Sequence, residues 1–216
     1  MKSIKLFGAL LTSLFLSGCL SNTPPPQHYL LHTSAVTHAK KPLFRAPLNI
    51  APVQSYQAWG STGFMYRLSE YEYQIDYYHR FLISPDTMMT EIVTENLAQS
   101  GLFKSVQENN QLLEAPHYSL TLYLLKFYAD YQDLTRPLAV ISFKVNFSGN
   151  AALGEHTSFQ KIFTAEIPLQ DNTSEDLINA WQTGMNQITN DIIKTIQAHH
   201  PKLKKKNIVP DMAPQA

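Results

Sequence analysis

Hydrophobic residues recur with a period of two along much of the chain, which is typical of β-strands with one buried face. Every second residue from Ala139 to Phe147 is apolar, and the residues between them are polar from Ser142 onward. In the runs 64–68 and 71–77, aromatic or aliphatic residues occupy every second position, so the two runs predict a β-hairpin. Further strands are predicted at 29–31, 48–53, 102–106, 118–127 and 163–167.

The predicted strand 118–127 changes phase along its length. Its apolar residues first lie on one side, at Leu120, Leu122 and Leu124, and then shift to Leu125 and Phe127. A β-bulge, or a strand that is buried on both faces, would produce this shift.

Two stretches follow the helical period instead. Ser84 and Pro85 form a helix start signal, in which the serine can cap free amides and proline suits the first helical position. Apolar residues then recur at helical spacing and Gly101 offers a left-handed stop, which predicts a helix over 85–100. A second amphipathic helix is predicted over 173–198, with Asn172 and Glu175 as a variant of the capping box.

These elements predict one domain of the α/β class, an α+β sandwich in which a mostly antiparallel sheet is covered by the two helices. We place this domain at residues 28–200.

The N-terminus carries the pattern of a secretory signal. Lys2 and Lys5 precede the apolar run 6–16, which is too short to span a ~30 Å hydrocarbon core as a helix. The run ends in Leu-Ser-Gly-Cys at residues 16–19, which resembles a bacterial lipobox, and Cys19 is the single cysteine of the chain. We therefore predict that residues 1–18 are removed and that Cys19 is acylated. An ordinary secreted protein with an accidental cysteine, or an uncleaved anchor, is the alternative.

The residue after the cysteine indicates which membrane holds the anchor. An Asp at this position would suggest retention in the inner membrane by the sorting pattern that the lipobox implies, but the residue is Leu20. We therefore predict the outer membrane, at its periplasmic face.

The two ends of the mature chain differ in composition from the domain between them. Residues 19–27 contain three consecutive prolines and predict an extended stalk. Residues 201–216 carry four lysines and three prolines, and we predict a basic, disordered tail. The tail is either a solvated end or a contact for anionic lipid or an acidic partner.

Charge and motifs exclude several kinds of function. Lys and Arg together balance Asp and Glu at 17 each, which gives no support for a nucleic-acid binder. His28 and His32 lie in a predicted extended stretch, about 13 Å apart, too far to share a metal ion. The sequence contains no nucleophile elbow, phosphate-binding glycine loop or zinc-binding helix. We assign no catalytic residue, no metal site and no cofactor.

An unusual density of aromatic residues remains to be explained. Nine of them lie within residues 56–81. Most are expected to pack in the core or to pair across strands. The alternative is a face that docks a protein or binds acyl chains. The candidate partner- or lipid-binding residues are Tyr66, Arg67, Tyr71, Tyr73, Tyr77 and Phe81.

The order of several short motifs resembles the ABC-type transport auxiliary lipoprotein family. The motifs are the run 63–73, Tyr77 to Phe81, Ser84-Pro85 before a helix, the run 100–106, and a closing helix with Trp181. The similarity covers most of residues 19–200. Phe81 stands where many members carry tryptophan, and the basic tail is additional.

The resemblance implies a non-catalytic accessory of a lipid-moving ABC system. Its partners would be a permease, an ATPase and a mammalian-cell-entry-type substrate-binding protein, and the family resemblance also implies homo-oligomers at the outer membrane. The cargo would be phospholipid or another hydrophobic compound. Two alternatives remain open: a carrier that itself binds lipid between sheet and helix, and an envelope-assembly lipoprotein unrelated to transport.

Overall fold

The structure is a computed structural model that describes residues 24–33, 39, 41–56, 58–108, 115–153 and 157–200. The predicted signal peptide, the predicted acylation site Cys19 and the predicted tail lie outside the described residues.

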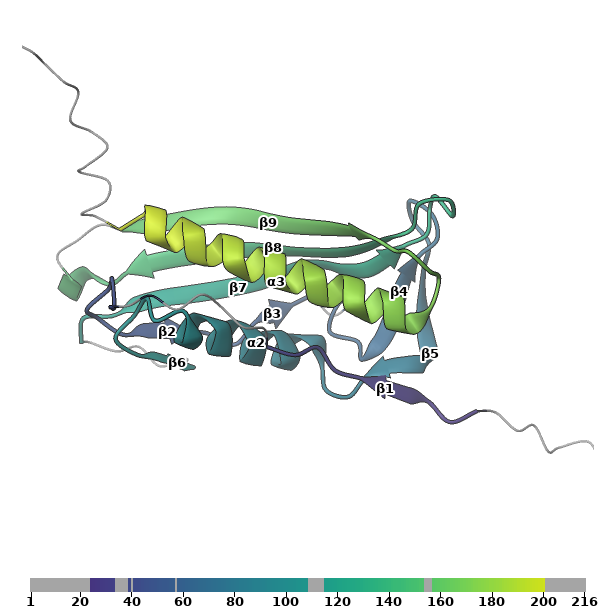
Figure 1. The fold of residues 1–216 in the computed structure, drawn as a ribbon, viewed down its shortest axis with the longest axis horizontal. Helices are drawn as coiled ribbons and strands as arrows, with labels where there is room; N and C mark the ends of the chain where they lie inside the picture. Colours follow the sequence, from purple (N-terminus) through teal and green to yellow (C-terminus); the bar gives the residue numbers. More distant parts are fainter. Residues whose placement is uncertain are drawn as a thin grey trace, which may run out of the picture.

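A long central strand, β7 (Tyr118–Asp130), organises the sheet (Figure 1). It pairs along its whole length with β8 (Leu138–Gly149), which in turn pairs with β9 (Ser158–Pro168), and both pairs are antiparallel. The register of β7 against β8 shifts between Leu124 and Lys126. This shift confirms the bulge that the change of phase in 118–127 predicts.

Three short strands follow one another along the other edge of β7. They are β2 (Leu48–Ile50), β3 (Gln54–Ser55) and β4 (Gly63–Arg67), and all three pair with β7 in parallel. Together they form one interrupted strand. The predicted strand 48–53 ends early, at Ile50, and Pro52 beyond it lacks the amide proton that a ladder requires.

The sheet is completed by strands that extend this edge at its two ends. At one end, β6 (Val106–Glu108) pairs in parallel with β2. At the other end, β5 (Tyr73–Phe81) pairs antiparallel with β4, and β1 (Gln27–Tyr29) pairs in parallel with β5. The result is a mixed sheet of nine strands in which the long pairs are antiparallel.

Two helices cover one face of this sheet, as Figure 1 shows. They are α2 (Pro85–Gln99) and α3 (Ser174–Ala198), and α3 lies across β8 and β9. A single 3-10 turn, η1 (Ala151–Leu153), follows β8. The predicted α+β fold with two main helices is thereby confirmed.

The helix ends correct two details of the prediction. Ser84 makes no capping bond to a backbone amide, because its hydroxyl pairs with the Thr87 hydroxyl at 2.8 Å. The N-cap of α3 is Thr173, not Asn172, since the Thr173 side chain accepts the Asp176 amide at 3.1 Å. Gly101 ends α2 in the predicted left-handed conformation, with φ of 65°.

The loop after α2 also differs from the prediction. Residues 102–105 do not form a strand, and Phe103 makes only an isolated parallel bridge to Phe44. Both rings are buried and stack with centroids 4.7 Å apart. Here packing into the core, not strand pairing, accounts for the apolar residues.

The main core fills the space between the sheet and the two helices. Its largest fully buried side chains include Trp181, Phe44, Phe64, Phe81, Phe143 and Phe147. A second, smaller cluster on the opposite face joins Met65, Tyr128 and Val140. Because Val140 belongs to this cluster, the first part of β8 is buried on both faces, whereas the sequence predicted a half-buried strand.

Candidate functional site

The predicted candidate residues lie at one end of the molecule, on the β4–β5 hairpin (Figure 1). The structure divides them into three groups. Phe81 is 2% exposed, and its ring centroid lies 4.8 Å from Phe64 and 5.5 Å from Trp181. Phe81 is thus a core residue that joins the hairpin to α3, and its ring does not line the surface.

Tyr66 and Arg67 are partly buried and hold the hairpin together. The Tyr66 hydroxyl donates to the Asp76 carboxylate at 2.9 Å. The Arg67 guanidinium donates to Asp130 at 3.1 Å and lies 5.8 Å from the centre of the Tyr128 ring. These contacts tie β4 to β5 on one side and to β7 on the other.

Tyr71, Tyr73 and Tyr77 are exposed, at 86%, 41% and 77% of their surface. They belong to a larger set, because seven of the eleven large hydrophobic side chains that are exposed among the described residues lie between residues 68 and 82. We call this set the β5 surface: Leu68, Tyr71, Tyr73, Ile75, Tyr77, Tyr78 and Leu82. Exposed apolar side chains that are concentrated on one strand and the turns beside it are typical of a docking surface.

A bulge in β5 accounts for the exposure of Tyr77 and Tyr78. Gly63 pairs with Arg80, but Met65 already pairs with Ile75, so β5 accommodates extra residues between these pairs. The bulge breaks the alternation of the strand, and Tyr77 and Tyr78 protrude from it.

The Asp76 side chain holds this bulge. One carboxylate oxygen accepts the backbone amides of Tyr78 and His79, at 2.7 and 3.1 Å. The other accepts the Tyr66 hydroxyl and lies 2.7 Å from the His79 ring nitrogen Nδ1. A β-bulge that is fixed by four contacts to one carboxylate presents its neighbouring tyrosines on a rigid support.

The hydrogen bonds also set the protonation of the two partners. Burial by itself would raise the pKa of the Asp76 carboxyl, but the hydrogen bonds from His79, Tyr78 and Tyr66 outweigh burial and lower this pKa below its ordinary value. Burial raises the pKa of the Tyr66 hydroxyl well above its ordinary value, and the hydrogen bond to Asp76 raises it further. At neutral pH the carboxylate therefore accepts and the phenol donates.

The outer edge of β5 is only partly paired. β1 covers it from His79 to Phe81, and among the described residues no other strand pairs with this edge. In the parallel register, the residues that would cover the edge before His79 are Pro24, Pro25 and Pro26, which carry no amide proton. The proline run thus prevents β1 from beginning before Gln27. In the described part of the chain, the tyrosine-rich half of β5 is therefore left with a free edge.

Replacing Asp76 with Asn should destabilise the hairpin. The substitution keeps the shape of the side chain but removes the charge that its donors face, and such a change costs about 1–3 kcal/mol of unfolding free energy. Urea denaturation at pH 7 measures the loss. Asp133→Asn is the matched control, because Asp133 accepts the Thr135 amide and hydroxyl in an exposed loop. It should have the smaller effect, and equal effects would contradict the role assigned to Asp76.

The stabilisation by Asp76 should depend on pH in a defined direction. Since the pKa of Asp76 is lower in the folded than in the unfolded chain, its contribution is complete above the unfolded value, ~3.9, and is lost as the pH falls through the folded value. The stability difference between the wild type and Asp76→Asn should therefore shrink below about pH 4.

No group of three or more metal-binding side chains occurs among the described residues. In the same part of the chain, no helix is long and apolar enough to cross a membrane. The geometry thus defines an α+β domain whose distinctive feature, among the described residues, is an exposed strand edge rich in aromatic side chains.

The sequence matches the family of ABC-type transport auxiliary lipoprotein components over residues 29–193. The chain belongs to this family, and membership in a lipoprotein family implies attachment to a membrane of the cell envelope. No curated protein matches the sequence.

Solved structures share the fold at low sequence identity. A protein from Xanthomonas campestris has a TM-score of 0.67 at 14% identity, over 84% of this chain and 99% of its own. An uncharacterised protein has a TM-score of 0.59 at 18% identity, over 76% of this chain and 99% of its own. A hypothetical protein from Chlamydia trachomatis has a TM-score of 0.50 at 12% identity, over 73% and 99%.

Proposed function

We propose that this chain is a non-catalytic lipoprotein that serves a mammalian-cell-entry-type ABC system, which moves phospholipid or another hydrophobic compound between membranes. Acylated Cys19 holds it at the periplasmic face of the outer membrane. Its task is to dock a component of the transport system, and the β5 surface makes this contact. The exposure of the β5 tyrosines is the observation that carries the proposal.

The chemistry of the β5 surface supports docking of a protein. Tyrosines are among the residues that contribute most to protein interfaces, because a large ring and a hydroxyl are presented with little conformational entropy to lose. The free edge of β5 beside them offers backbone amides and carbonyls. An extended segment of a partner adds to such an edge by strand pairing, while its side chains contact the exposed rings.

The interior of the domain favours docking over the alternative of a lipid carrier. A carrier would need an apolar cavity between the sheet and α3. That space is filled by side chains that are at most 5% exposed: Leu124, Phe143, Phe163, Trp181 and Ile188. This region is a packed core.

Crosslinking in intact cells tests the proposal. Tyr77 is replaced with the photoreactive residue p-benzoylphenylalanine in the full chain, and the crosslinked proteins are identified by mass spectrometry. We expect the substrate-binding protein or the permease of an ABC system. Tyr56, which is 67% exposed but lies outside the β5 surface, is replaced in the same way as the control.

Substitution gives the corresponding loss of function. Tyr71→Ser with Tyr77→Ser should reduce recovery of the partner about tenfold or more, since each tyrosine is a candidate hot spot. Tyr56→Ser should leave the recovery unchanged. Crosslinks from Tyr77 that contain no transport component would contradict the proposal, and so would equal recovery with both variants.

A further inference from the structure

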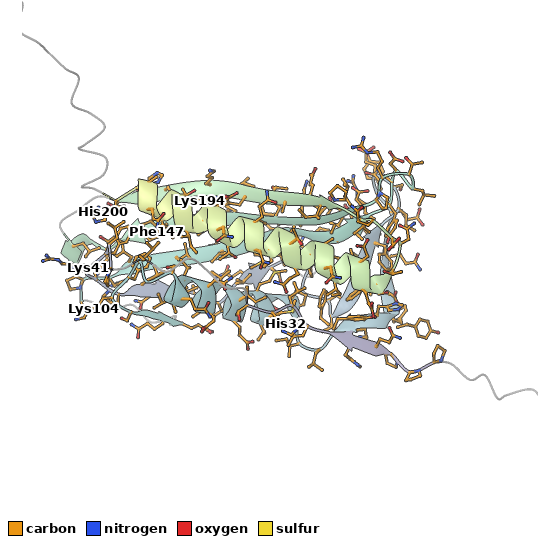
Figure 2. The ribbon with its side chains drawn as sticks, in the orientation of Figure 1. His32, Lys41, Lys104, Phe147, Lys194 and His200 are labelled. Atoms are coloured by element: carbon orange, nitrogen blue, oxygen red, sulfur yellow. The ribbon has the colours of Figure 1, made fainter. Side chains whose placement is uncertain are left out.

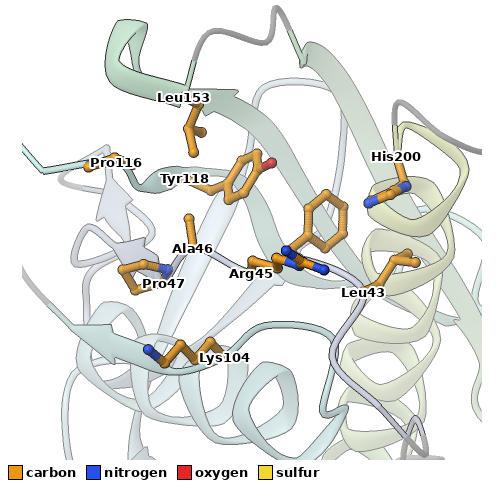
Figure 3. Close-up of a pocket in the computed structure, with 10 residues that line it drawn as sticks. Leu43, Arg45, Ala46, Pro47, Lys104, Pro116, Tyr118, Leu153 and His200 are labelled. Carbon is orange, nitrogen blue, oxygen red and sulfur yellow. The ribbon is translucent and has the colours of Figure 1, made fainter.

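A pocket of about 470 Å³ opens at the end of the molecule where α3 terminates (Figure 3). It lies between the segment that precedes β2, the loop after α2 and the end of α3. Its volume falls in the range of small-molecule sites, 300–1,000 Å³. The β5 surface is elsewhere, on the hairpin at the opposite end of the sheet.

The charged groups that line this pocket are all cationic or basic. Arg45, Lys104 and His200 face it from three separate segments, and in the part of the chain that the structure describes no carboxylate lines it. Among the described residues, neither Arg45 nor Lys104 takes part in an ion pair. A concave site with charge of one sign concentrates ligands of the opposite sign, so the pocket selects an anion.

His200 adds an unsatisfied polar atom. The residue is 9% exposed, and its ring nitrogen Nδ1 is buried without a hydrogen-bond partner. Its ring meets the Phe44 ring edge to face, with centroids 4.9 Å apart. Buried polar atoms are normally paired, but this nitrogen has no exposed surface, so an oxygen of a bound ligand would contact it only after the ring turns toward the pocket.

The remaining wall of the pocket is apolar. Phe44 and Tyr118 are 1% and 4% exposed, and they pack edge to face with centroids 4.9 Å apart. Leu43 and Leu153 complete this wall. Phe44 and Tyr118 lie behind this wall, and its exposed apolar surface belongs to Leu43, Ala46, Pro116 and Leu153. A free inorganic anion would leave that surface in contact with water, whereas an anion carried on a hydrocarbon body would cover it.

The pocket lies far from the point at which the N-terminal segment meets α3. The Gln182 side chain bonds both the amide and the carbonyl of His32, at 2.7 and 2.8 Å. At ~1.5 Å per residue, the axis of α3 rises about 24 Å between Gln182 and Ala198. Figure 2 shows His32 well separated along the long axis from Lys104 and His200.

We propose that this basic pocket binds the phosphate head group of an anionic glycerophospholipid, and that the first part of its acyl chains lies against Leu43 and Leu153. The inference deepens the proposed function by giving the chain a lipid contact of its own, away from its anchor. Four lysines, at positions 202, 204, 205 and 206, follow His200 and Pro201 in the sequence. A site for anionic lipid next to His200 would give these lysines a role, whereas docking through the β5 surface does not.

Titration with water-soluble probes tests the site. The mature full chain with Cys19→Ser is titrated with dihexanoyl-phosphatidylglycerol below its micelle concentration, and binding is followed by calorimetry. NMR follows the imidazole signals, and those of His200 are assigned by their loss in His200→Gln. We expect the His200 signals to shift and the anionic lipid to bind about tenfold more tightly than dihexanoyl-phosphatidylcholine.

Variants separate this pocket from other surfaces. Arg45→Ala with Lys104→Ala should weaken binding about tenfold or more, because two charged contacts to the phosphate are lost. Both side chains are exposed, so the fold should be unaffected, and circular dichroism checks this. Lys126→Ala with Arg136→Ala removes two exposed cations outside the pocket and should leave the affinity unchanged. Tyr77→Ser should leave it unchanged as well.

Four results would overturn the inference. They are equal affinity for the two lipids, equal affinity for inorganic phosphate, tighter binding of a glutamate-rich peptide than of the lipid, and no effect of the Arg45 and Lys104 substitutions. The assay contains no transport component. Lipid binding in the pocket without crosslinks from Tyr77 to an ABC system would therefore remove the proposed function alone, and the reverse result would remove only the pocket.

Discussion

Replacing Trp181 with Ala should lower the unfolding free energy by about 3–5 kcal/mol, the usual cost of removing a large aromatic side chain from a core. Trp181 has no exposed surface and lies on α3 against rings from three strands. Its centroid distances are 5.1 Å to Phe64, 5.5 Å to Phe81 and 4.7 Å to Phe127. The indole therefore joins the helix to β4, β5 and β7 at once. A loss of this size is a large part of the 5–15 kcal/mol that stabilises a typical domain.

Two further variants make the measurement specific. Trp181→Phe should cost less than Trp181→Ala, because it keeps an aromatic ring and removes an indole N–H that is buried without a partner. Trp59→Ala deletes the same atoms from the smaller cluster on the other face, where Trp59 is only partly buried. Urea unfolding followed by circular dichroism compares all three. An equal loss for the two Trp-to-Ala variants would show that the aromatic junction contributes no special stability.

The sequence predicts those parts of the fold that depend on local periodicity. Both helices were predicted because a period of 3.6 persists along them, and the three long strands were predicted in part from a period of 2. For β9 the prediction covered only residues 163–167, about half of the strand. Even the bulge in β7 left a visible change of phase at Leu125. The parallel pairing of β2, β3 and β4 with β7 left no such trace, because strands of two to five residues carry too little pattern to reveal their partners.

The candidate site shows where local patterns fail. Tyr77 and Phe81 lie four residues apart and would face the same side of a regular strand, yet one is 77% and the other 2% exposed. The difference comes from the bulge that Asp76 holds through its contacts with Tyr78 and His79. In the sequence, Asp76 does not differ from the other acidic residues that alternate with the aromatic residues of this strand. Its role depends on a hydroxyl that reaches it from Tyr66 in another strand.

The basic pocket could not be predicted for a different reason. Arg45, Lys104 and His200 are far apart in the sequence, and each is unremarkable beside its neighbours. They meet because the chain before β2 and the loop after α2 pack against the end of α3 through Phe44 and Phe103. The basic tail that begins at residue 201 was the one signal at this end of the molecule that the sequence made visible.

Replacing Cys19 with Ser should move the full chain from the membrane fraction to the soluble fraction. A serine cannot form the thioether that carries the diacylglycerol. One acyl chain alone binds a membrane only marginally, whereas two or more hold a protein stably, so complete loss of acylation should release roughly nine-tenths of the protein or more. Fractionation of the envelope and mass spectrometry of the mature N-terminus measure the two parts of this expectation.

The controls test whether Cys19 acts through its position or through its thiol alone. Cys19→Ser combined with Ser21→Cys restores a cysteine two residues beyond the lipobox pattern, and this variant should stay soluble. If Cys19→Ser alone remains in the membrane, adding Tyr71→Ser and Tyr77→Ser asks whether the β5 surface holds it there. Release only by the combined variant would mean that the exposed tyrosines bind the membrane or a membrane-bound partner strongly enough to replace the anchor. Retention of a variant from which mass spectrometry shows residues 1–18 to be absent would contradict acylation of Cys19 as the means of attachment, because neither the thioether, the apolar run 6–16 nor the β5 surface would account for the membrane association.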